Sequence, residues 1–365
     1  GLMLRNVGLR KSVEQPVLDL NFAASQIGSN AAPDSRIAFS RGSNAWFVDT
    51  DGLVKKSPHN LITQSEAINS SPWFVTSSIT ITSNSITAPD GTLTADKLEK
   101  TATAFQAVIS GFTGAGVNDY AASFFVKEGT LDDVSILLSS DNASTLNARI
   151  VFDLTAETAT NFGSANLKSA SIVNVGDGWY RCTVEATFAN QTSPRVYIYP
   201  GVYSSSDAGF VYIWGVQVSQ HTTLPVDNPY IKTEGSAVYA ARLDHDPATN
   251  TPRGLLIEEA RTNLVTDSES HTYLNGDILV SQSGSAGLAP DGTNTAIAFM
   301  ETAGTGNHVS RKVNIAIAAN THISFSFFVK ANGREHGSIE FFNAGGGFAN
   351  FDLGAGNRRH PDKNT

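Results

Sequence analysis

The pattern of hydrophobic and polar positions predicts β-strands along most of the chain. In YAASFFVK (residues 120–127) alternate positions are apolar, and GWYRCTVEATF (178–188) alternates in the same way. Residues 195–199 and 210–218 give two further strands. Alternation with a period of two is the signal of a half-buried strand. In the first segment it places four residues on the core face: Tyr120, Ala122, Phe124 and Val126.

Helical signal is weak throughout. Only the charged stretches 95–100 (ADKLEK) and 256–264 (LIEEARTNL) suggest a helical turn. Many short strands separated by turn residues are typical of a two-sheet antiparallel sandwich.

The segment SFFVK occurs twice, at residues 123–127 and 326–330. Three further blocks repeat in the same order: NLIT with SE (60–66 and 263–269), APDGT (88–92 and 289–293) and FDL (152–154 and 351–353). Ordered blocks at a nearly constant offset indicate a duplicated domain with small loop insertions. The second copy of the strand would place four residues inward: Ile323, Phe325, Phe327 and Val329.

We therefore predict an all-β fold, an antiparallel jelly-roll sandwich with one complete and one partial copy, plus a small β platform. The platform would contain a hairpin around the DTDG turn at 49–52 and the segments 240–247 and 253–258. The predicted domains follow the chain: 1–59, attachment segment and platform hairpin; 60–235, sandwich; 236–262, platform hairpin and linker; 263–365, second, incomplete copy.

The second copy has only residues 354–365 after its FDL block, whereas the first continues to about residue 235. No second GWYRC or IWGVQ segment occurs. Three explanations stay open: the chain is part of a longer fibre, another subunit supplies the missing strands, or residues 354–365 reflect a frameshift or an alternative end. Half a sandwich exposes apolar surface and open strand edges. We expect residues 263–354 to fold only against neighbouring chains.

Composition and charge exclude several classes of protein. The net charge is −9 and no basic run occurs, so we expect no nucleic-acid partner. No apolar stretch is long enough to span a bilayer, and the N-terminus lacks the apolar region of a secretory signal, so we expect a soluble protein with no membrane partner. The single cysteine, Cys182, excludes an intrachain disulfide and is predicted to be a buried strand thiol.

The chain resembles bacteriophage virion fibre proteins, that is, tail-fibre, tail-spike or head-fibre subunits, over roughly residues 18–354. The segments that carry the resemblance are LDLNFA (18–23), DSRIAFSRGSNAWFVDTDGLV (34–54), NLITQSE (60–66), APDGT with ADKL (88–98), GDGWYRCTV (176–184), VYIWGVQV (211–218) and LDHDPATNTPRGLLIEEARTNLV (243–265). The sandwich itself resembles the jelly-roll carbohydrate-binding modules attached to glycosidases.

This resemblance implies a virion structural protein on the tail or capsid surface, organised as a homotrimer or other symmetric oligomer. Its N-terminal part would attach to portal, capsid or tail proteins, and its outward domains would recognise host cell-surface polysaccharide. The alternative is a carbohydrate-binding module of a secreted glycan-active enzyme.

No catalytic set stands out, so we expect no enzyme activity. The acidic residues lie in turns or at strand ends without the pair that glycoside hydrolysis requires: Asp90, Asp96, Asp153, Asp177 and Glu185. Ser and His are too scattered to nominate a triad. Asp244 and Asp246 share one face of a strand, and we interpret them as a polar strand end rather than a metal site. A structural calcium stays open by analogy with jelly rolls, and no other cofactor is expected.

Candidate carbohydrate contacts are side chains that face away from the core, because pyranose faces stack on aromatic rings. They are Trp73, Trp179, Arg181, Glu185, Arg195, Tyr197, Tyr199 and Tyr203. The alternative interpretation makes Trp179 and Trp214 core or subunit-contact residues. Aromatic residues and Arg are also enriched at protein interfaces, so the pattern does not separate a glycan from a protein partner.

Overall fold

The computed structural model describes most of the chain after residue 38. The described ranges are residues 39–114, 118–140, 147–188, 193–220, 230–258, 263–265, 268, 276–311, 315–316, 323–340, 348–354 and 357–359. The LDLNFA segment lies outside them. The chain divides into two compact units, residues 1–261 with 291–294, and residues 262–290 with 295–365. Within the described ranges, no helix is long and apolar enough to cross a bilayer.

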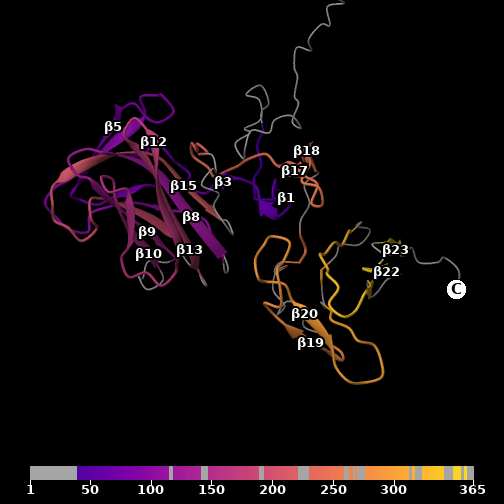
Figure 1. Cartoon of the computed structure of the whole chain (residues 1–365). Coiled ribbons are helices and arrows are strands. Elements are labelled where there is room, and N and C mark those ends of the chain that lie inside the picture. Colours follow the sequence, from indigo (N-terminus) through magenta and orange to yellow (C-terminus); the bar gives the residue numbers. More distant parts are fainter. Residues whose placement is uncertain are drawn as a thin grey trace, which may run out of the picture. The chain divides into compact units, whose positions relative to one another are not determined.

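The first copy is a sandwich of two six-stranded antiparallel sheets (Figure 1). One sheet has the order β12-β13-β8-β15-β6-β5 and the other the order β11-β10-β9-β14-β7-β4. The first sheet contains β5 (Ile79–Ile86), β6 (Ala95–Lys100), β8 (Asn118–Glu128), β12 (Leu167–Gly176), β13 (Trp179–Phe188) and β15 (Gly209–Gln220). The second contains β4 (Phe74–Val75), β7 (Val108–Gly111), β9 (Asp133–Ser139), β10 (Asn147–Asp153), β11 (Thr158–Asn161) and β14 (Arg195–Pro200). The prediction of an all-β antiparallel jelly-roll sandwich is confirmed.

The suggestion of a helical turn at 95–100 is wrong, because these residues form β6 between β15 and β5. Leu98 is fully buried in the core, and this tertiary contact overrides the weak helical signal of the charged neighbours. Of the second charged stretch, residues 256–258 lie outside strands and helices, and 259–262 lie outside the described ranges.

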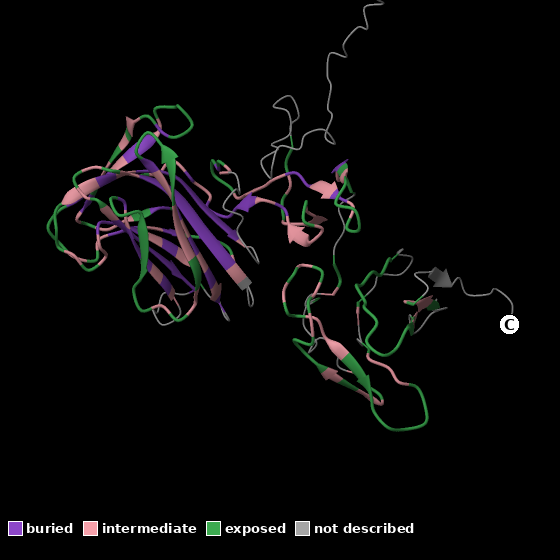
Figure 2. Ribbon diagram, in the orientation of Figure 1, coloured by how far each residue is buried: buried purple, intermediate pink, exposed green. Residues whose placement is uncertain are grey.

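The core lies between the two sheets and is built from alternate strand positions. Tyr120, Ala122, Phe124 and Val126 of β8 are at most 1% exposed, as the alternation predicts. Phe124 meets Phe152 of the facing sheet edge-on, with ring centroids 6.2 Å apart. Figure 2 shows the buried interior of both sheets in purple.

Cys182 is fully buried on β13, and burial raises the pKa of its thiol well above the ordinary value.

Both platform hairpins form. β1 (Trp46–Val48) pairs with β2 (Val54–Lys56), and β17 (Leu243–His245) pairs with β18 (Pro252–Leu255). The Val48 N–H donates to Asp244 Oδ1 at 2.9 Å, and Arg242 Nη1 donates to the Trp46 carbonyl at 3.0 Å. A third pair, β3 (His59–Asn60) with β16 (Val238–Tyr239), runs between the hairpins and the sandwich in sequence.

Asp246 closes the turn between β17 and β18. Its carboxylate accepts the N–H groups of Ala248 and Thr249 and pairs with Arg253 at 2.7 Å. These bonds lower the pKa of Asp246 to about 2, and the hydrogen bond from the Ala248 N–H has the largest effect. Asp244 and Asp246 therefore have structural partners, in agreement with their interpretation as a polar strand end.

The second copy contains only small sheets in its described part. β19 (Val280–Ser283) pairs with β20 (Ala298–Glu301), and β21 (His336–Glu340), β22 (Phe348–Asp352) and β23 (Asn357–Arg359) form a three-stranded sheet. No described side chain between residues 263 and 354 is buried.

The second SFFVK segment is not a strand, so the prediction that Ile323, Phe325, Phe327 and Val329 face a core is wrong. Residues 323–330 form no described strand, and Phe327 and Phe328 are 46% and 74% exposed. In the first copy, β8 lies between β13 and β15. The chain carries no second copy of either sequence.

Candidate functional site

The outer surface of the sheet that contains β14 carries a cluster of aromatic rings. Val196 and Ile198 of β14 are fully buried in the core, so Arg195, Tyr197 and Tyr199 point to the other side. The rings of Tyr197 and Tyr199 are nearly parallel, with planes at 9° and centroids 6.3 Å apart. Sequence alternation placed these three side chains on one face, and the structure brings them together there.

Loops bring further rings to the same surface. Tyr203, in the turn after β14, lies 5.9 Å from Tyr199, 5.3 Å from Phe105 and 5.1 Å from Phe162, measured between ring centroids. Phe105 is 59% exposed and Phe162 44% exposed, whereas Tyr199 is buried. We call this cluster the aromatic face: Phe105, Ile109, Leu137, Arg149, Phe162, Tyr197, Tyr199 and Tyr203.

Arg149 of β10 supplies the cation of the aromatic face. Its guanidinium carbon lies 4.0 Å from the centroid of the Tyr203 ring, close enough for a cation–π contact. Burial raises the pKa of Tyr199 to about 12, while the charge of Arg149 acts in the opposite direction. Tyr199 is therefore neutral at physiological pH. Sequence reasoning missed Phe105, Phe162 and Arg149, because only the strand order brings them beside β14.

One end of this sheet surface is acidic. Asp133, at the start of β9, lies directly opposite Asp153, at the end of β10. Burial, followed by the charges of Asp132 and Asp153, raises the pKa of Asp133. Asp153 also accepts the Ala156 N–H at 2.7 Å and so closes the turn after β10. The pattern of acidic residues along the chain does not reveal a carboxylate partner for Asp153, whereas the register of the β9–β10 hairpin places Asp133 opposite it.

Three of the predicted contacts lie on the outer side of the other sheet, on β13. Arg181 donates to Ser123 Oγ at 3.3 Å, and Glu185 accepts from Ser169 Oγ at 2.8 Å. Trp179 is only 2% exposed, packs with Phe125 and Trp214, and donates its indole N–H to the Thr87 carbonyl at 3.3 Å. The Trp179 ring is covered in this structure, and its role as a carbohydrate contact stays a prediction. The alternative interpretation of Trp179 and Trp214 as core residues holds.

Trp73 is also covered. It lies in the turn before β4, is 7% exposed, and donates its indole N–H to the Gln64 carbonyl at 2.7 Å. Its role as a carbohydrate contact also stays a prediction. Of the eight predicted contacts, Arg195, Tyr197, Tyr199 and Tyr203 share one surface.

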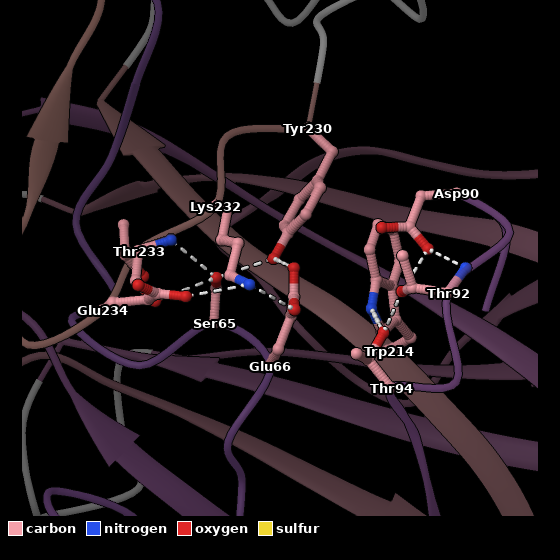
Figure 3. A network of polar contacts seen from close by, with 10 residues as sticks. All are labelled: Ser65, Glu66, Asp90, Thr92, Thr94, Trp214, Tyr230, Lys232, Thr233 and Glu234. Atoms are coloured by element: carbon pink, nitrogen blue, oxygen red, sulfur yellow. Dashed lines mark hydrogen bonds and ion pairs between the residues drawn. The ribbon is translucent and has the colours of Figure 1, made fainter. Parts of the chain in front are cut away.

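Figure 3 shows the polar network around Trp214 and Tyr230. The Tyr230 hydroxyl lies 2.6 Å from Ser65 Oγ and donates to Glu66 Oε1 at 2.9 Å. Lys232 pairs with Glu66 at 3.2 Å, and Trp214 donates its indole N–H to Thr94 at 2.9 Å. The pKa of Tyr230 is strongly raised, and burial is the largest cause. These polar groups have partners inside the protein, which favours a structural role for this side of the sandwich.

Metal ligands do not gather in the described part of the chain. No three His, Cys, Asp or Glu side chains there come together in a group that could hold a metal ion.

No family model and no curated protein matches the chain. Solved structures that are similar to it include the enzymatically active domain of tailspike protein 4 of bacteriophage CBA120. That match has 13% identity and a TM-score of 0.26, and covers 44% of this chain and 21% of the tailspike domain. The chain thus spans about a fifth of that domain.

Two further similar structures contain carbohydrate-binding modules. One comprises the CBM22-1–GH10 modules of the Clostridium thermocellum xylanase 10B with xylohexaose. That match has 14% identity and a TM-score of 0.27, and covers 47% of this chain and 30% of the xylanase chain. The other is TmCBM61 with β-1,4-galactotriose. That match has 11% identity and a TM-score of 0.24, and covers 44% of this chain and 98% of TmCBM61.

Proposed function

We propose that the first copy binds glycan through its aromatic face. The observation that carries the proposal is the ring cluster around Tyr203, in which Tyr197 and Tyr199 lie nearly parallel and Phe105 and Phe162 are exposed. Ring faces of this kind stack on the C–H faces of pyranose rings, and tyrosine hydroxyls supply hydrogen bonds beside them. Contiguous exposed rings on a protein surface mark interaction sites.

A glycan array probed with the full chain tests this proposal. We expect Tyr197→Ala and Tyr203→Ala to weaken binding of the strongest array ligand about tenfold or more, because each removes a ring from the aromatic face. Tyr212→Ala is the matched control, since Tyr212 is a half-buried tyrosine of β15, in the opposite sheet. Absence of binding to every glycan, or equal loss in all three variants, would contradict the proposal.

The proposal extends to a virion fibre or spike subunit on the tail or capsid surface. Its support is the resemblance of residues 34–54, 176–184, 211–218 and 243–265 to phage fibre proteins. In this role the chain forms a homotrimer or other symmetric oligomer and attaches through its N-terminal part to portal, capsid or tail proteins. Immunogold labelling of purified virions with antibodies to the sandwich tests it, and unlabelled particles would favour the alternative of a carbohydrate-binding module in a secreted enzyme.

The proposal assigns binding to this chain and no hydrolysis. Asp133 and Asp153 are the described carboxylates to test, because they lie opposite each other at the end of the same sheet surface. A reducing-end assay with the bound polysaccharide and the full chain should show no new chain ends. Release of ends that is lost in Asp133→Asn would overturn this part of the proposal.

A further inference from the structure

The charge of the aromatic face comes from two arginines. Leu137 of β9 pairs with Arg149 on one side and with Tyr197 on the other, so these three residues form a row across three strands. In the next row, Ser139 pairs with Asn147 and with Arg195. Both guanidinium groups therefore belong to the outer surface of the sheet, beside the tyrosine rings.

Arg149 is held in place, and no carboxylate of the described ranges pairs with its charge. The guanidinium stacks on Tyr203, and its Nε is buried without a hydrogen-bond partner. No carboxylate of the described ranges forms an ion pair with Arg149 or with Arg195. Buried polar groups of folded proteins are nearly always hydrogen-bonded, so an exception calls for an explanation. The Nε–H is covered, so a carboxylate or another oxyanion would meet the terminal Nη groups of the stacked guanidinium.

We propose that the aromatic face selects anionic glycans and that Arg149 pairs with the acidic substituent of the bound sugar. This inference rests on the proposed function and assigns the class of glycan. The sugar ring stacks on the accessible rings of the aromatic face, and its carboxylate, sulfate or phosphate oxygens accept hydrogen bonds from the Arg149 guanidinium. Arg195, one row away, adds attraction without direct stacking on Tyr203.

The acidic end of the sheet restricts which anionic glycans fit. Asp133 precedes Leu137 by four residues on β9, which is about 13 Å at ~3.3 Å per residue. Asp132 and Asp153 lie with it. A polymer with an anion on every sugar would bring a negative charge to this end, where the carboxylates repel it. The surface therefore favours a heteropolymer in which acidic residues alternate with neutral ones.

The test uses the full chain on an array of neutral, uronic-acid, sialylated and sulfated oligosaccharides that includes oligogalacturonate and hyaluronan fragments. We expect the strongest ligands to be acidic, with fragments that alternate acidic and neutral sugars above oligogalacturonate. Arg149→Gln should weaken their binding about tenfold or more, since a charge-assisted hydrogen bond is lost. Arg149→Lys should lose less, because it keeps the charge. Arg253→Gln, which changes an arginine of β18 outside the two sandwich sheets, should leave binding unchanged.

Two controls keep the test decisive. Thermal unfolding of each variant shows whether it folds, and higher salt should weaken wild-type binding of acidic glycans while leaving neutral ones unchanged. Binding of neutral glycans with no effect of Arg149→Gln or salt would overturn the anion selectivity and leave the proposed function standing. Strongest binding of oligogalacturonate would overturn the inference about alternating charge. Absence of binding to every oligosaccharide would overturn the proposed function itself.

Discussion

The same five residues, SFFVK, have different structures in the two copies. In the first copy they belong to β8, which pairs with β13 and β15, and Phe124 is fully buried. In the second copy they lie in residues 323–330, which form no described strand, and Phe327 is 46% exposed. Alternation specifies which side chains share a face, but a strand also needs neighbours that pair with it. The first SFFVK segment has both the alternation and the paired neighbours, whereas the second has the alternation alone in the described ranges.

Local hairpins of the second copy keep the register of the first. Ile79 pairs with Lys100 in β5–β6, and Val280 pairs with Glu301 in β19–β20, each 201 residues later (280 − 79 and 301 − 100). Likewise, Asp133 and Asp153 of β9–β10 correspond to His336 and Asp352 of β21–β22. Hairpins form from residues close in sequence, whereas β8 pairs with strands that start more than 50 residues further along the chain. The described second copy thus forms its local hairpins but not the strand whose counterpart needs distant partners.

The largest difference is expected from Phe124→Ala and its matched variant Phe327→Ala, which change corresponding residues of the two copies. Phe124→Ala should destabilise the first copy by about 3–5 kcal/mol, because it opens a cavity in the core. Phe327→Ala should change stability by less than about 0.5 kcal/mol, because the ring is already exposed. Urea unfolding followed by far-ultraviolet circular dichroism measures both. A comparable loss in the two variants would show that the second copy is packed in solution.

A second expected difference concerns pH and Asp96 of β6. Asp96 is 2% exposed, and burial raises its pKa to about 6 from 3.8. The folded state therefore holds the proton more tightly than the unfolded state, and this group's contribution to stability falls as pH rises from about 4 to about 6. The corresponding residue of the second copy is Ile297, which does not titrate.

Asp96→Asn has no carboxyl group to titrate, so the variant should not lose this stability. As pH rises from about 4 to about 6, the free energy of unfolding of the variant minus that of the wild type should increase by about 3 kcal/mol, at 1.36 kcal/mol per pKa unit. His59, whose pKa burial lowers to about 4, acts in the opposite direction but is present in both proteins and cancels in the difference. Urea unfolding at several pH values measures the difference. A constant difference between pH 4 and 7 would contradict the assignment.

The smallest effect is expected at the turn that both copies share. Asp90 Oδ1 accepts the Thr92 N–H at 2.9 Å, and Asp291 Oδ1 accepts the Thr293 N–H at 3.0 Å. Asp90→Ala should cost about 1 kcal/mol, the net value of such a hydrogen bond, because its hairpin is part of the sandwich. Asp291→Ala should leave the unfolding midpoint unchanged. A shift of the midpoint in Asp291→Ala would show that the second-copy turn is coupled to a cooperative core.

Sequence alternation was sufficient where a side chain's environment follows from its own strand. It placed Phe124 in the core and Tyr197 and Tyr199 on the outer surface, because period two is a local property. It did not show that Trp179 is covered, since Thr87 and Trp214 reach it from distant parts of the chain. Arg149 was missed for the same reason: its place beside Tyr203 depends on the strand order β10-β9-β14.

The functional claim is that glycan recognition belongs to the aromatic face of the first copy, which has no counterpart to β14 in the described second copy. Amide hydrogen exchange of the full chain, with and without the strongest array ligand, tests it most directly. We expect slower exchange in the loops that carry Phe105, Phe162 and Tyr203, and no change at β13 or at residues 323–330. Slower exchange at β13 or 323–330, with those three loops unchanged, would contradict it.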